Sequence, residues 1–149
     1  MMLDFFITIE RLMLAFVFGG IIGWERERKH GAAGLRTHIL VCMGSALTML
    51  VSLDTFEIYK GMGSIDPGRI AAGVVTGIGF IGAGAIIRNP EKVLGLTTAA
   101  SIWVSAAIGL AVGCGYITAA LATTVLSFIA LSALKKIEQF EQKRNAQSK

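Results

Sequence analysis

Residues 68–87 read GRIAAGVVTGIGFIGAGAII and contain a single charged residue, Arg69. An α-helix of about 20 apolar residues is long enough to cross about 30 Å of hydrocarbon. Stretches of the same kind occupy residues 5–24, 34–53, 95–114 and 116–134. Continuous apolar runs of this length are not barrel strands. We therefore predict an all-α integral membrane protein, with five transmembrane helices in residues 1–134 and a short charged tail in 135–149.

The basic residues of this chain predict its orientation in the membrane. Charged residues make up 16% of the sequence, and the net charge is +4. The basic residues flank the apolar runs, so we attribute them to membrane topology and expect no nucleic-acid partner. Those on the predicted inner side are Arg26, Arg28, Lys29, Arg36, Arg88, Lys92, Lys135, Lys136, Lys143, Arg144 and Lys149. The positive-inside rule then predicts an outer N-terminus and a cytoplasmic C-terminus.

The third run is unusually rich in glycine, and we predict that its helix is the centre of the bundle. The glycines expected to pack closely are Gly73, Gly77, Gly79, Gly82 and Gly84. Small residues at i, i+4 spacing let another helix backbone approach. Pairs of the same spacing occur at Gly19/Gly23 and Gly109/Gly113. The spacing does not distinguish packing within one chain from packing between two, and we expect a homodimer.

Glu10 and Arg11 lie inside the first apolar run and are candidate functional residues. An ionisable side chain near the membrane centre costs at least about 2.5 kcal/mol, so it is often retained for function. The alternative is that both side chains extend to the outer interface, where the cost disappears. Helical spacing puts Arg11 closer than Glu10 to the face of Gly19 and Gly23.

Asp66 and Arg69 stand three residues apart at the predicted outer start of the third helix. One interpretation is a helix cap with a solvated ion pair. The other is that Asp66 joins Asp54 and Glu57 to bind a divalent cation, with Mg²⁺ as the possible ion. No regular acidic motif accompanies these residues, and the sequence predicts no other cofactor.

On the predicted inner side, short polar segments interrupt the apolar runs. The candidate residues there are Arg36, Thr37, Arg88, Asn89, Thr97 and Thr98. Helix N-termini beside arginine side chains would suit an anion or a lipid headgroup, whereas Thr and Asn also serve simply as caps. We interpret the charged residues 25–29 as a solvated helix end, and His30 and His38 as too few for a metal site. No catalytic motif is present, so we do not expect an enzyme.

In order along residues 10–109, these motifs resemble the membrane domain of the MgtC/SapB family. The matching strings are ERL at 10–12, GIIG at 20–23, ERE at 25–27, AGLRT at 33–37, GSAL at 44–47, DPGRIAA at 66–72, GIGFIGAG at 77–84 and GLTTAASIW at 95–103. The resemblance implies a multi-pass bacterial inner-membrane protein used in adaptation to magnesium limitation. In some members it implies a virulence-related role and restraint of the F-type ATP synthase.

The chain departs from the family pattern in two ways. Many members continue into a soluble C-terminal domain, where this sequence has only its short tail. Members often carry a basic residue directly before the GLTT string, where this chain has Leu94; Arg88 or Lys92 would have to substitute.

Two functions remain open at the level of sequence. The first is a regulator that docks another membrane protein through its glycine-lined helices. The alternative is a small divalent-cation transporter or channel that works as a dimer, using Glu10, Arg11 and Asp66. The middle of the predicted spans offers only hydroxyl groups such as Ser45 and Thr76, which favours the regulator because coupled transport usually needs a deeper ionisable group.

Overall fold

A computed structural model describes residues 4–61 and 66–147, with side chains up to residue 133. Its helices are α1 (Phe5–Arg28), α2 (Leu35–Ile58), α3 (Gly68–Gly84), α4 (Leu96–Cys114) and α5 (Ile117–Gln147). Two short strands, β1 (Ile87–Arg88) and β2 (Val93–Leu94), lie between α3 and α4. The prediction of a helical protein is confirmed. The short strand pair was not predicted from the sequence.

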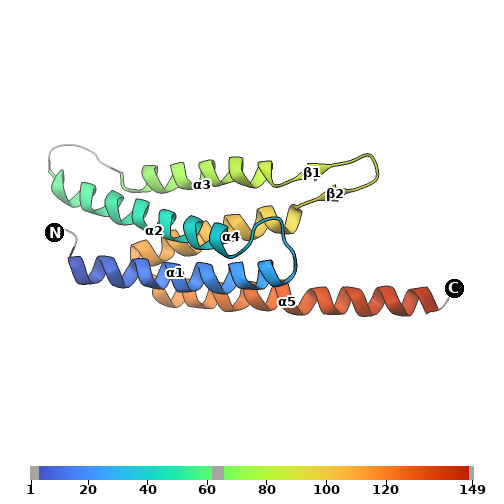
Figure 1. Cartoon of the computed structure of the whole chain (residues 1–149). Helices are drawn as coiled ribbons and strands as arrows, with labels where there is room; N and C mark the ends of the chain where they lie inside the picture. Colours follow the sequence, from blue (N-terminus) through green and yellow to red (C-terminus); the bar gives the residue numbers. More distant parts are fainter. Residues whose placement is uncertain (1–3, 62–65, 148–149) are drawn as a thin grey trace.

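The helices run alongside one another in a bundle (Figure 1). The most extensive contacts are those of α2 with α1 and with α4, while α5 packs on α1 and α4. We call one end of the bundle the hairpin end, because the antiparallel pair β1–β2 lies there together with the turn from α1 to α2. The opposite end carries the start of α1, and we call it the N-terminal end.

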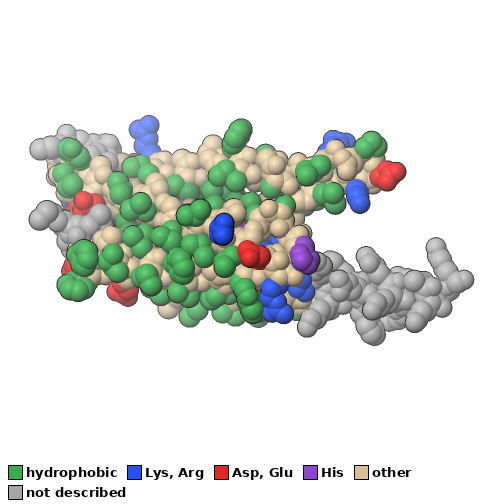
Figure 2. Space-filling view, viewed as in Figure 1, with side chains coloured by type: hydrophobic (Ala, Val, Ile, Leu, Met, Phe, Trp, Pro, Cys, Tyr) green, Lys and Arg blue, Asp and Glu red, His purple; other side chains and the backbone are tan. Residues whose placement is uncertain are grey.

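By length and apolar composition, α1, α2 and α4 could each cross a membrane. The helix Gly68–Gly84 and the segment Ile117–Ala133 are apolar but shorter. Large apolar side chains remain exposed along the bundle, up to 84% for Phe80. Figure 2 shows such side chains between ends where charged groups gather. These features fit a membrane protein, while the number of spans and their orientation stay predictions.

The closest helix contacts involve glycines of α1 and α4. A Cβ atom at Gly109 would overlap the backbone oxygen of Cys42 in α2, and one at Gly113 would lie 2.7 Å from another α2 backbone oxygen. At Gly19 and Gly23 of α1, a Cβ atom would likewise come within 2.7 Å of α2 backbone atoms. The backbone of α2 is therefore held closely between two glycine-bearing helices, which is the packing that small residues permit.

The prediction that the third helix is central is wrong for this chain. Helix α3 lies at the edge of the bundle, against α2 and α4 (Figure 1). A Cβ atom would meet nothing within 4 Å at Gly73, Gly77, Gly79 and Gly84. Only Gly82 faces a neighbour, with Ala99 of α4 at 3.6 Å. Glycines at the same i, i+4 spacing therefore face open space on α3 and pack against a neighbouring helix in α1 and α4.

Several element boundaries differ from the sequence predictions. Helix α2 continues to Ile58, beyond the end of the apolar run 34–53, and α5 continues through most of the predicted tail. Helix α3 ends at Gly84, and the chain then forms the hairpin instead of a simple break. Gly95 closes the hairpin with a φ of 87°, a conformation that glycine adopts without strain, and α4 starts immediately afterwards.

Candidate functional site

Five polar side chains are buried at the hairpin end, and hydrogen bonds link four of these residues across α1, α2 and α4. They are Glu25, Arg26, His38, Thr98 and Ser101, and we call them the buried polar cluster. Glu25 is only 3% exposed and Arg26 only 8%. Burying charged groups costs free energy unless they are paired, so such groups mark a candidate functional site.

Arg26 joins the end of α1 to the start of α4. Its Nη2 donates a hydrogen bond of 3.1 Å to Oγ1 of Thr98. The backbone oxygen of Arg26 accepts from the N–H of Gly31 at 2.9 Å, which closes the turn leading to α2. One residue therefore holds the end of α1, the turn after it and the first turn of α4.

His38 connects α2 to α4 through both ring nitrogens. Nδ1 lies 2.8 Å from the backbone oxygen of Gly34, and Nε2 lies 3.1 Å from Oγ of Ser101. A carbonyl oxygen only accepts, so Nδ1 must carry a proton. Ser101 is also 2.8 Å from the backbone oxygen of Thr98 and has a single hydroxyl proton. If that proton goes to Thr98, Nε2 must donate and the ring is doubly protonated; a neutral ring requires Ser101 to turn toward Nε2.

Glu25 is the least satisfied member of the buried polar cluster. Neither carboxylate oxygen has a hydrogen-bond partner among the described residues, and neither does Nε of Arg26. An unpaired buried carboxylate is costly. Arg26, the next residue, forms no ion pair with Glu25, so its positive charge acts on the carboxylate only from beyond 4 Å. Among the described residues, Glu25 is therefore a buried acceptor without a donor.

The prediction of a solvated helix end over residues 25–29 is wrong for its first two members. Glu27 and Arg28 are exposed: Glu27 Oε2 accepts from the N–H of Leu35 at 2.8 Å, and Arg28 lies 4.7 Å from the ring of Trp24. Glu25 and Arg26, however, continue the buried stripe of Ala15, Phe18 and Ile22 along α1. Spacing of three and four residues from Ile22 was the signal that could have identified them.

Arg11 and Glu10 have different surroundings, as helical spacing predicts. Arg11 is half-buried, and its Nη1 donates to the backbone oxygen of Gly113 at 2.6 Å. A cation there satisfies a carbonyl in the last turn of α4, where the helix dipole is negative. Glu10 is exposed on α1. The structure thus gives Arg11 a packing role at the N-terminal end of the bundle.

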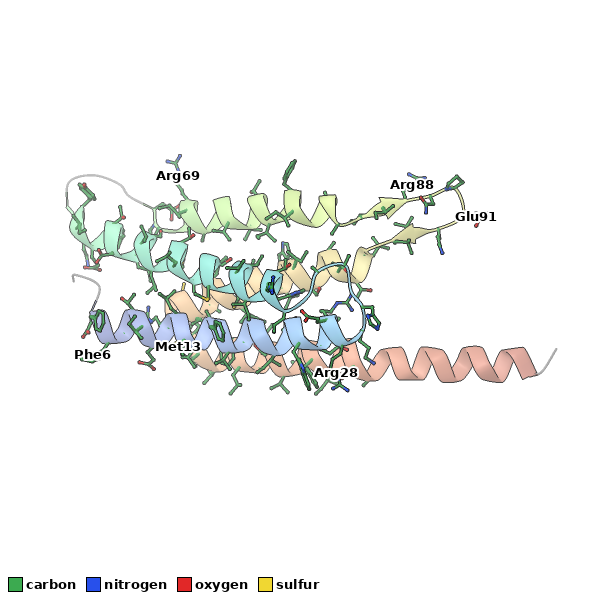
Figure 3. The ribbon with its side chains drawn as sticks, in the orientation of Figure 1. Phe6, Met13, Arg28, Arg69, Arg88 and Glu91 are labelled. Carbon is green, nitrogen blue, oxygen red and sulfur yellow. The ribbon has the colours of Figure 1, made fainter. Side chains whose placement is uncertain are left out.

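Asp66 and Arg69 do not form the predicted ion pair. Oδ1 of Asp66 accepts from the N–H of Gly68 at 2.8 Å, which supports the expected capping role. Arg69 points away from the bundle in Figure 3. Among the described residues the single ion pair is the exposed one between Lys60 and Glu57, at 3.4 Å.

The predicted divalent-cation site is not assembled in the described part of the chain. No group of three or more His, Cys, Asp or Glu residues there is placed to hold a metal ion. Asp54 and Glu57 instead line a cleft of about 90 Å³ beside Arg11 and Asp4. The described structure does not bring these two residues together with Asp66, and a metal role for Asp66 stays a prediction.

The predicted inner polar group is only partly brought together. Thr98 is buried in the cluster, Thr97 is exposed beside it, and Arg36 and Thr37 lie in the first turn of α2. Arg88 and Asn89 are carried away from the bundle on the hairpin, as Figure 3 shows for Arg88. In place of Arg88, the structure puts Arg26 beside the first turn of α4.

A groove of about 400 Å³ runs between α2 and α3. We call it the α2/α3 groove; its lining residues are Leu40, Val41, Gly44, Ser45, Thr48, Val74, Gly77, Ile78 and Ile81. A Cβ atom would meet nothing within 4 Å at Gly44 or at Gly77, so the two helix backbones are accessible there. The hydroxyls of Ser45 and Thr48 bond to their own helix, so the groove presents a largely apolar surface.

Comparison with known proteins gives a consistent picture. The "Putative magnesium transporter YhiD" of Escherichia coli K12 is 46% identical over 131 residues, which cover 87% of this chain and 61% of that protein. "Protein MgtC" of Brucella abortus is 45% identical, covering 80% of this chain and 48% of that protein. "Protein MgtC" of Salmonella typhimurium is 43% identical, covering 88% and 54%.

The chain therefore spans only about half to three-fifths of the length of these relatives. No solved structure matches it. The family model described as the MgtC family matches residues 12–140, which is most of the sequence. This match includes the buried polar cluster, the α2/α3 groove and the glycines that clamp α2. The expected family resemblance is confirmed: the chain belongs to the MgtC family.

Proposed function

We propose that this chain is a bacterial inner-membrane protein that serves adaptation to magnesium limitation by regulating a membrane partner. Membership of the MgtC family and the name of the Escherichia coli relative support the relation to magnesium. The excess of basic residues at and beyond the hairpin end supports a cytoplasmic location for that end. We propose no catalytic activity.

The observation that carries the regulatory proposal is the unfilled α2/α3 groove. Its wall includes Gly44 and Gly77, where no atom fills the space a Cβ would take. Small residues favour close approach of a second helix in lipid, where packing rather than the hydrophobic effect drives association. A groove between two apolar helices therefore suits a transmembrane helix of a partner protein.

The partner that the family resemblance suggests is the membrane sector of the F-type ATP synthase. That sector consists of apolar helices, which is the chemistry that the α2/α3 groove accepts. A second copy of this chain, forming a homodimer, is the competing occupant of the same surface. The two occupants differ in mass, so covalent capture from within the groove distinguishes them.

A functional test compares two glycines of α3. Gly77→Leu fills the α2/α3 groove, whereas Gly79→Leu makes the same change on α3 outside the groove lining. We expect cells that depend on this chain to lose growth at low Mg²⁺ with Gly77→Leu and to keep it with Gly79→Leu. ATP-driven proton pumping in inverted vesicles should be restrained by the wild type and released in Gly77→Leu. Equal growth and pumping in both variants would overturn the proposal.

Transport of a divalent cation is the second candidate. It is favoured by the ionisable side chains of Glu25, Arg26 and His38 inside the bundle, in addition to the hydroxyls considered from sequence. The discriminating experiment is Mg²⁺ flux through the purified chain in sealed liposomes, with Glu25→Gln beside the wild type and Glu10→Gln as the exposed control. Saturable flux that falls only in Glu25→Gln would establish transport. If the folded protein carries no flux, transport is excluded and regulation of a membrane partner remains the proposed function.

A further inference from the structure

His38 is the buried one of the two histidines in the chain. Its side chain is 0% exposed, whereas His30 is exposed in the turn after α1. Histidine is the side chain whose charge ordinarily changes close to neutral pH. A charge that appears in the interior costs far more free energy than one at the surface, so it can change how helices pack. His38 is therefore the described residue best placed to turn a change of pH into a change of structure.

The hydrogen bonds of the His38 ring depend on its charge. Because Nδ1 donates to the backbone oxygen of Gly34, Nε2 of the neutral ring must accept, and Ser101 in α4 donates to it over 3.1 Å. A second proton turns Nε2 into a donor. The single hydroxyl proton of Ser101 must then rotate to the backbone oxygen of Thr98, 2.8 Å away. Protonation of the ring thus reverses the hydrogen bond that joins α2 to α4.

A charged His38 ring would be close to another buried cation. The positive charge of Arg26 in α1 acts on the ring, and the Arg26 guanidinium is held in place by its bond to Thr98. Two positive charges in the interior repel each other strongly because screening there is weak. Glu25, which is also buried in α1, supplies one negative charge against these two positive ones. Protonation of His38 in the packed bundle is therefore opposed, and the bundle must adjust when it occurs.

The remaining charged groups near the start of α2 lie nearer the surface. They are Glu27, Arg28, Lys29, His30 and Arg36. Helix α3 contributes one titratable side chain, Arg69, and α4 contributes one, Cys114, and both are at the N-terminal end of the bundle. Arg26 is thus the described cation that a protonated His38 would meet in the interior.

The two residues of the His38–Ser101 bond adjoin the α2/α3 groove. Val41 lies one turn after His38 and lines the groove. In α4, Ser101 is followed by Ile102, which is buried in one apolar cluster with Ile78 of α3. Val41 packs against this cluster, and Ile78 lines the groove. A change in how α2 meets α4 at His38 therefore reaches the wall of the groove through side chains in contact.

We propose that His38 is a proton switch for the α2/α3 groove. With a neutral ring, Ser101 donates to Nε2, and α2 stays against α4 and gives the groove its described shape. A proton taken up from water at the hairpin end charges the ring, reverses the bond and adds repulsion from Arg26. The start of α2 then moves away from α4, and the groove loses one wall until the proton is released. Control of partner binding in this way rests on the proposed function of the groove, whereas the switch is a property of the isolated chain.

The first test follows the purified chain alone, in detergent, by nitrogen NMR from about pH 8 to about pH 5, a range that includes the ordinary pKa of histidine. We expect Nε2 of His38 to gain a proton as the pH falls, and the backbone signals of Gly44 and Gly77 in the groove to shift with the same midpoint. In His38→Gln these glycine signals should stay constant. An Nε2 whose protonation does not change, or glycine signals that move independently of it, would overturn the proposal.

The other histidine provides a matched control. His30 has a φ of 53°, a conformation that asparagine tolerates better than most residues, so His30→Asn should fold normally. We expect both the protonation of His38 and the shift of the glycine signals to persist in this variant. Loss of the glycine shift in His30→Asn would assign the pH response to the exposed histidine and contradict the switch.

Arg26→Gln tests the repulsion with the histidine ring in place. Nε2 of His38 should still gain its proton, but the shift of the Gly44 and Gly77 signals on acidification should become smaller, because the cation that repels the ring is absent. A merely structural role for Arg26 would leave the size of this shift unchanged or increase it, and that result would contradict the electrostatic basis of the switch.

The second test asks whether the switch controls partner binding. A photoreactive phenylalanine analogue replaces Leu40, which lines the groove and is exposed. It is activated in inverted membrane vesicles at about pH 8 and at about pH 5.5, on either side of the ordinary histidine pKa. We expect an adduct with another membrane protein at the higher pH and its loss at the lower pH, with equal adducts at both in His38→Gln.

The outcomes separate the switch from the proposed function. A wild-type adduct of equal yield at both pH values would overturn the switch and leave the partner in place. Absence of an adduct at either pH would contradict the proposed partner, and the glycine signals of the isolated chain would then decide the switch without it.

Discussion

Nη2 of Arg26 in α1 donates to Oγ1 of Thr98 in α4 over 3.1 Å, in the interior of the bundle. The two residues are 72 positions apart in sequence, and neither is accessible from outside. This bond ties the end of α1 to the first turn of α4, while the carboxylate beside it, Glu25, has no described hydrogen-bond partner. Two buried ionisable residues therefore stand at this end of the bundle, one hydrogen-bonded across helices and one without a described partner.

Removing the charge of Arg26 should destabilise the chain more than removing both charges. Arg26→Gln breaks the bond to Thr98 and leaves Glu25 buried without a compensating cation, at a cost of about 1–3 kcal/mol. The double variant Glu25→Gln/Arg26→Gln removes the isolated charge and should recover part of the loss. Reversible unfolding in detergent measures both. A double variant as unstable as the sum of the singles would show that the two charges do not interact.

Enlarging two glycines that both belong to i, i+4 pairs should have very different effects on stability. Gly109→Leu forces a side chain against the α2 backbone at Cys42 and should prevent or strongly impair folding. Gly77→Leu projects into the α2/α3 groove and should leave unfolding of the isolated chain nearly unchanged. Thermal unfolding of the two purified variants provides the comparison. Equal losses would place α3 in a tighter bundle than the structure describes.

The adjacent charges of α1 should also differ in importance. Arg11→Gln removes the charge-assisted bond to the oxygen of Gly113 and should cost about 1 kcal/mol. Glu10→Gln changes an exposed group and should have little effect on unfolding. A larger loss from Glu10→Gln than from Arg11→Gln in the same assay would refute the packing role of Arg11.

The hydrogen bonds of His38 predict where its ring protons lie. Because Nδ1 faces the backbone oxygen of Gly34, that nitrogen should be protonated whether the ring is neutral or charged. Nitrogen NMR of the chain labelled at histidine, with His38→Gln to assign the signal, reports this directly. A neutral ring that carries its proton only on Nε2 would contradict the hydrogen-bond network described for α2 and α4.

The apolar runs predicted the helices because membrane-spanning length and apolar composition are properties of each segment alone. The role of each glycine could not be predicted in the same way. Gly77 and Gly109 both belong to pairs of i, i+4 spacing, yet Gly77 faces an open groove and Gly109 faces the backbone of α2. Spacing shows that close approach is possible, and the fold decides which helix makes it.

The candidate site was predicted incompletely for a related reason. Charged residues 25–29 were interpreted as one solvated segment, although helical geometry turns successive side chains by about 100°. Glu25 and Arg26 therefore follow the buried stripe, while Glu27 and Arg28 face outward. The hairpin carries Arg88 away from the bundle and depends on pairing between β1 and β2. Strands of two residues are too short to show a recognisable sequence pattern, so this pairing could not be predicted.

The central claim, that the α2/α3 groove holds a helix of a membrane partner, is tested most directly by photocrosslinking in living cells. A photoreactive phenylalanine analogue is introduced at position 77 inside the groove and, as a control, at position 79 outside it. We predict a discrete adduct of this chain with another membrane protein from position 77 and none from position 79. An adduct of twice the mass of the chain, the same pattern from both positions, or no protein adduct at all would contradict the claim.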